Sequence, residues 1–78
     1  FTEQSIAGVY LIDADIIPDD RGSFTRAWMP DEFRAHGLST DIAQAMFAFN
    51  HRRGTIRGMH WQAHPFWEEK TVRVTRGR

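Results

Sequence analysis

The chain has 78 residues, with ten basic and ten acidic side chains and a formal net charge of zero. This length allows one small domain at most, and the balanced charge argues against a general affinity for nucleic acid. The chain has no cysteine, which excludes disulfides as a source of stability, and no run of roughly 20 apolar residues that would cross a bilayer. We therefore expect a cytoplasmic protein whose partner is neither nucleic acid nor a membrane.

The first half of the sequence predicts two strands and a short helix. Residues 8–17 (GVYLIDADII) combine strand-forming apolar side chains with acids spaced between them. Residues 18–22 (PDDRG) have the chemistry of a turn, and residues 23–28 alternate small or polar side chains with larger ones, which indicates a second strand. Residues 30–37 (PDEFRAHG) begin with proline and end with glycine, which is typical of a short surface helix.

The second half of the sequence predicts further strands. Helix and strand compete over residues 41–50, and the phenylalanines there favour a strand. Residues 55–62 and residues 70–75 (KTVRVT) are further β runs, each preceded by a turn or loop. Short strands at close spacing, with turns between them, predict an all-β sandwich or barrel that forms a single domain over residues 1–78.

The densest group of chemically useful side chains is RGMHWQ at residues 57–62, followed by Lys70. His60 on a strand can act as a general base near neutral pH, or it can be a histidine without a role. Lys70 shares a strand face with two valines, so it lies either at a frayed strand start or in a cavity. Strict alternation puts Arg57 and His60 on opposite faces, unless Gly58 forms a bulge that re-aims one of them.

A metal site is the next alternative. Three histidines and two glutamates are candidate ligands, namely His51, His60, His64, Glu68 and Glu69. Metal-binding cupins place a second histidine two residues after the first, and Gln62 occupies that position here. The cations Arg57 and Lys70 would also repel a metal ion. The sequence therefore disfavours a metal site.

Three motifs fall in order along the chain: DRGSF at residues 20–24, RGMHWQ at residues 57–62 and KTVRV at residues 70–74. Together they resemble the N-terminal half of the dTDP-4-dehydrorhamnose 3,5-epimerase family. The resemblance implies an all-β jelly-roll or cupin β-barrel, of which this chain is the N-terminal half with one short surface helix. It also implies an enzyme that needs neither a metal nor another cofactor.

The resemblance implies an isomerase of deoxysugar and O-antigen biosynthesis. Its substrate would be a dTDP-linked 4-keto-6-deoxysugar, epimerised at C3 and C5 through proton abstraction beside the C4 ketone. His60 would be the general base, and Lys70 would lie beside the C4 oxygen, where a fixed cation stabilises developing negative charge. The implied substrate-binding residues are Arg21 and Arg57 at the diphosphate, Phe24 at the thymine, and Arg26 and Gln44.

Two departures from the family pattern bear on the substrate. Arg26 stands where many members carry glutamate, and Met46 replaces the polar partner of Gln44. A sugar-nucleotide-binding cupin fragment without turnover is therefore the alternative function, and a metal-dependent cupin oxygenase or isomerase is a third.

The resemblance also implies that the catalytic site of this chain is incomplete and that the protein forms a dimer. The family's catalytic tyrosine, and the aspartate that orients its histidine, match positions beyond residue 78, so we expect an inactive fragment. Half a jelly roll leaves unpaired strand edges, and the family implies a homodimer with strand exchange. The enzymatic interpretation requires that the imidazole of His60 and the ammonium of Lys70 project into one dry cavity.

Overall fold

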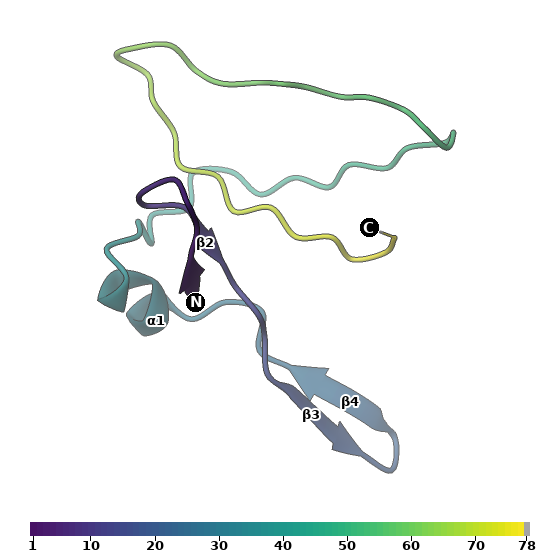
Figure 1. Cartoon of the computed structure of the whole chain (residues 1–78). Coiled ribbons are helices and arrows are strands. Elements are labelled where there is room, and N and C mark those ends of the chain that lie inside the picture. The colour runs from purple at the N-terminus through teal and green to yellow at the C-terminus, as the bar shows by residue number, and fades with distance from the viewer. Residues whose placement is uncertain (78) are drawn as a thin grey trace. The chain divides into compact units, whose positions relative to one another are not determined.

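The computed structural model describes residues 1–77, and Arg78, the last residue of the predicted domain, lies outside them. The chain divides into two compact units, Phe1–Ala43 and Gln44–Arg78. The elements of the first unit follow the order β1, β2, β3, β4 and α1 (Figure 1). Each unit is described by itself below, and the prediction of one domain over residues 1–78 stays a prediction.

The first sheet is a pair of very short antiparallel strands, β1 (Thr2–Glu3) and β2 (Tyr10–Leu11). The connecting loop is held by its own hydrogen bonds: the Gly8 amide donates to the Glu3 carboxylate at 3.0 Å. Gly8 has a φ of +79°, a conformation that favours glycine. The sequence predicted one continuous strand over residues 8–17, and the structure has only β2 and the start of β3 in that range.

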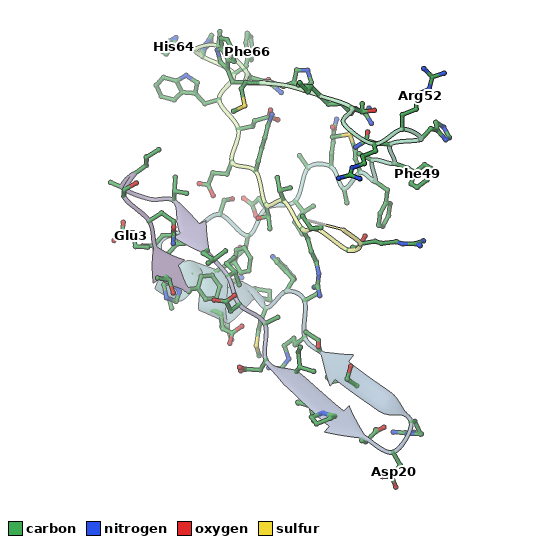
Figure 2. The ribbon with its side chains drawn as sticks, turned by 45° about the vertical axis from the view of Figure 1, so that its right-hand side comes forward. Glu3, Asp20, Phe49, Arg52, His64 and Phe66 are labelled. Carbon is green, nitrogen blue, oxygen red and sulfur yellow. The ribbon has the colours of Figure 1, made fainter. Side chains whose placement is uncertain are left out.

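The second sheet is a hairpin of β3 (Ile16–Asp19) and β4 (Gly22–Thr25), which pair in antiparallel register. Its two-residue turn carries Asp20 at the tip of the hairpin (Figure 2). The predicted turn began at Pro18, but Pro18 belongs to β3, opposite Ser23. A proline is tolerated there because a two-stranded ribbon has only edge strands. The strand predicted over residues 23–28 is confirmed only as far as Thr25.

The predicted helix is confirmed as α1 (Pro30–Ala35). Pro30 begins it, where a missing N–H leaves no intrahelical hydrogen bond unmade. Gly37 follows the helix with a φ of +71°, and the Leu38 amide donates to the Phe33 carbonyl at 3.0 Å. This hydrogen bond satisfies a carbonyl that the helix itself leaves free, so the sequence Ala-His-Gly ends the helix in the predicted place.

The core of the first unit is an aromatic cluster around Phe33, which is the buried apolar residue of the described chain at 4% exposure. Phe1 meets Phe33 edge-on at 5.4 Å and stacks on the His36 ring at 4.1 Å. Tyr10 of β2 and Trp28 also reach the cluster, through His36 and Phe33 respectively. These contacts join the first sheet to α1, because Phe1 and Tyr10 belong to the sheet side and Phe33 to the helix.

The second unit contains turns but no helix or strand within residues 44–77. The strands expected at residues 41–50, 55–62 and 70–75 are therefore wrong for this structure. A strand forms by backbone hydrogen bonding to a neighbouring strand. Between residues 44 and 77 the one backbone–backbone hydrogen bond is that of a turn, from the Phe66 amide to the Ala63 carbonyl at 2.9 Å. The apolar side chains of these runs are exposed instead, including Phe47, Ile56 and Val72.

Most large apolar side chains within residues 1–77 are exposed, and Phe33 is the buried one. The two antiparallel sheets and one short helix are compatible with the all-β class, and residues 1–77 do not close a barrel. Within the same residues, no helix is long and apolar enough to span a membrane.

We expect Phe33→Ala to destabilise the first unit by about 3 kcal/mol, because it removes the side chain that the other aromatic rings surround. Urea denaturation followed through the NMR signals of residues 1–43 measures this change. Phe24→Ala is the matched control, since Phe24 is 62% exposed and its loss should cost less than about 0.5 kcal/mol. Equal effects of the two variants would contradict the assigned core.

Candidate functional site

Two segments of the second unit border an open hollow of about 330 Å³. We call it the His60–Lys70 hollow, and it is lined by His60, Trp61, Gln62, Trp67, Glu68 and Lys70. The chain reverses between the two segments, and Figure 2 shows His64 and Phe66 at this reversal. The reversal brings the RGMHWQ motif and the start of the KTVRV motif to one place, although neither forms a strand.

The ammonium of Lys70 contacts both segments. Its Nζ donates to the backbone carbonyl of His60 at 3.1 Å and forms an ion pair with the Glu68 carboxylate at 2.7 Å. An ammonium has three donors. These contacts within residues 1–77 use two of them, which leaves one for an acceptor on a ligand.

Sequence reasoning considered Glu68 and Gln62 only in relation to a metal, and the structure gives them another role. The Gln62 amide donates to the second carboxylate oxygen of Glu68 at 3.1 Å. Glu68 therefore accepts from Gln62 and Lys70 at once, one on each oxygen. The signal for the ion pair was present in the sequence: an acid two residues before a lysine lies on the same side of an extended backbone.

His60 and Lys70 line one hollow, but the expectation of a dry cavity is wrong for residues 1–77, because the hollow is open to water. His60 is exposed, and the Lys70 side chain is 44% exposed. Within residues 1–77, no hydrogen bond or ion pair engages the His60 ring, so no carboxylate orients it. A cation in water stabilises a nearby anion far less than the same cation in a low-dielectric cavity. The exposed Lys70 ammonium therefore lacks the burial that would strengthen its effect on a developing negative charge.

Arg57 lines a second hollow of about 340 Å³, together with Phe49, Asn50, His51, Arg52 and Thr55. Its guanidinium donates to the Asn50 side-chain oxygen at 3.3 Å. Figure 2 shows Phe49 and Arg52 at the chain reversal beside this hollow. Gly58, between Arg57 and His60, has a φ of +116°, but without a strand there is no bulge. The structure therefore puts Arg57 and His60 in separate hollows.

The other predicted binding residues are exposed or lie near the hairpin. Phe24 is in β4 and is 62% exposed. The Arg26 guanidinium contacts the Met29 sulfur at 3.1 Å. Gln44 is the first residue of the second unit and is exposed. Arg21, Phe24 and Arg26 thus belong to the first unit, and their role in one site with His60 stays a prediction.

Arg21 is engaged at the hairpin turn. Its guanidinium pairs with the Asp19 carboxylate at 2.8 Å, and its backbone amide donates to the other Asp19 oxygen at 2.8 Å. The side-chain hydrogen bond from Arg21, followed by the backbone one, lowers the pKa of Asp19 below its ordinary value. Arg21 itself is 90% exposed, so its remaining donors face solvent.

The candidate metal ligands do not converge. Among the residues that the structure describes, no group of three or more histidine or acidic side chains could hold a metal ion. His64 instead packs edge-on against Trp67 at 5.0 Å, and His51 against Phe49 at 5.1 Å. Glu68 pairs with Lys70, as described above.

Comparison with known proteins identifies a family. The family model described as dTDP-4-dehydrorhamnose 3,5-epimerase matches residues 3–78. A protein of that name from Sinorhizobium fredii is 36% identical over 77 residues, which are 99% of this chain and 40% of the relative. Another from Methanothermobacter thermautotrophicus is 31% identical, with the same coverage. The chain thus spans two fifths of the length of these relatives. No solved structure gives a significant match.

The Asp19–Arg21 pair predicts a pH dependence. A carboxyl whose pKa is lowered in the folded hairpin contributes stability above its ordinary pKa of 3.8. This contribution is lost as the pH falls through the lowered value. We expect Arg21→Gln to raise the pKa of Asp19 in an NMR titration of its carboxyl carbon, whereas Arg26→Gln should leave it unchanged. An unchanged titration in Arg21→Gln would refute the pairing.

Proposed function

The chain belongs to the dTDP-4-dehydrorhamnose 3,5-epimerase family, and we propose that it supplies the base and the cation of an epimerase site. The substrate would be a dTDP-linked 4-keto-6-deoxysugar. The names of the two relatives support this substrate class. The whole reaction belongs to a protein of the relatives' length, of which this chain covers two fifths.

The observation that carries the proposal is the hydrogen bond from the Lys70 ammonium to the His60 carbonyl, at 3.1 Å. It fixes a positive charge beside the residue that bears the imidazole. A proton next to a ketone is removed only when the enolate oxygen that results is stabilised. A base at His60 and a cation at Lys70 are the two groups that this step needs.

In the proposed mechanism the His60 imidazole takes a proton from the carbon beside the C4 ketone. The third donor of Lys70, which the protein contacts leave available, then bonds the oxygen that gains negative charge. General base catalysis contributes typically 100- to 10,000-fold. A positioned donor at the oxygen is worth about 3 kcal/mol in a water-excluded site. Exclusion of water therefore has to come from what covers the His60–Lys70 hollow.

We further propose the substrate-binding set that the resemblance implies. Arg21 and Arg57 would hold the diphosphate, since a guanidinium presents forked donors to phosphate oxygens. Phe24 would stack on the thymine, and its 62% exposure leaves the ring available. Arg26 and Gln44 complete the set. The assembly proposed with it is a cytoplasmic homodimer with strand exchange on a jelly-roll barrel.

The proposal is tested by solvent deuterium exchange into a dTDP-4-keto-6-deoxysugar, using a full-length protein that carries this sequence. We expect His60→Gln to slow exchange about 100- to 10,000-fold, and Lys70→Met to slow it about 100- to 1,000-fold. His64→Gln is the matched control, because His64 packs on Trp67 and does not line the His60–Lys70 hollow. Tight binding without exchange would instead establish a sugar-nucleotide-binding protein without turnover.

Residues 1–78 alone should not epimerise the same sugar. The His60 ring has no orienting carboxylate within residues 1–77, and its hollow is open to water. NMR of the sugar incubated with the purified chain in deuterated buffer measures this directly. Exchange at a rate near that of the full-length protein would contradict the expectation.

A further inference from the structure

The Glu68 carboxylate has a partner in each of the two segments that border the His60–Lys70 hollow, one on each oxygen. One oxygen receives the Lys70 ammonium at 2.7 Å, and the other receives the Gln62 amide at 3.1 Å. Gln62 is two residues from His60, so the second contact ties Glu68 to the segment that carries the proposed base. Within residues 1–77 each oxygen has one partner, so the carboxylate plane is fixed at two points.

These contacts determine where the Lys70 ammonium lies. A lysine side chain has many rotamers, and a single hydrogen bond to the His60 carbonyl leaves most of its stem free to rotate. Glu68 adds a charge-assisted contact from a second direction. With two of its three donors directed to fixed acceptors, the ammonium presents its remaining donor in one direction only.

We propose that Glu68 is a positioning residue, which acts on the reaction through Lys70 and is itself held by Gln62. The inference rests on the proposed function, since it assigns Glu68 to the cation of that site. Preorganised donors accelerate a reaction because they need not be reoriented as charge develops, so a loosened ammonium lowers turnover more than it lowers substrate binding.

The test uses a full-length protein that carries this sequence, and it first measures the order of the Lys70 ammonium. Lys70 is the only lysine of this chain, and the Lys70→Arg variant assigns its signal. In Glu68→Gln we expect the NMR order parameter of the Lys70 Cε to fall clearly below its value in the unsubstituted protein. Glu68→Asp, which keeps the charge, should retain part of the order.

Kinetics provide the second measurement. We expect Glu68→Gln to lower kcat about 10- to 100-fold while KM changes less than about threefold. Glu69→Gln is the matched control, since it removes the same charge one residue along the chain and should have a much smaller effect. If Glu68→Gln does not fold, Gln62→Met tests the same connection by removing the donor to the second Glu68 oxygen and should loosen Lys70 partially.

The outcomes separate the two proposals. An unchanged Lys70 order parameter in a folded Glu68→Gln, or equal effects of Glu68→Gln and Glu69→Gln, would overturn the positioning role. A protein in which Lys70 order depends on Glu68, but which shows no deuterium exchange even without substitution, would overturn the proposed function and retain the positioning role.

Discussion

The Lys70 ammonium is the point on which the second unit depends, because it joins segments ten residues apart in a part of the chain that has no sheet. The hydrogen bond to the His60 carbonyl crosses the reversal, and the ion pair to Glu68 lies within the second segment. Both contacts are exposed, and exposed ion pairs contribute little stability. Within residues 1–77 these charged groups are therefore held by exposed polar contacts and have no apolar cover.

The first unit is organised differently, around packing. Its aromatic cluster joins the first sheet to α1 through rings at 4.1 to 6.4 Å. The β3–β4 hairpin takes no part in that cluster, and its residues are exposed except for half-buried Thr25. Thus the unit combines one packed end with one solvated ribbon, and the ribbon carries two of the proposed substrate-binding residues, Arg21 and Phe24.

Local rules predicted the local structure. The helix at Pro30–Ala35 was predictable because proline, early acids and glycine act within one or two turns. The strands of the second half were not, because KTVRVT needs a neighbouring strand and the sequence does not say which residues supply it. The proximity of His60 to Lys70 was expected because their motifs resemble those of the family, and hydrophobic periodicity did not indicate it. The contact of Glu68 with Lys70 was missed although their spacing indicated it, because Glu68 had been considered only as a metal ligand.

The ion pair at the hairpin turn means that Arg21 is already bound to an anion before any ligand arrives. The pair uses one nitrogen of the guanidinium, and the other donors of this exposed side chain face solvent. The proposed diphosphate would therefore meet a guanidinium whose direction the hairpin turn has already set, and it could bind without displacing Asp19. Rising salt would weaken the internal pair and the proposed phosphate contact alike.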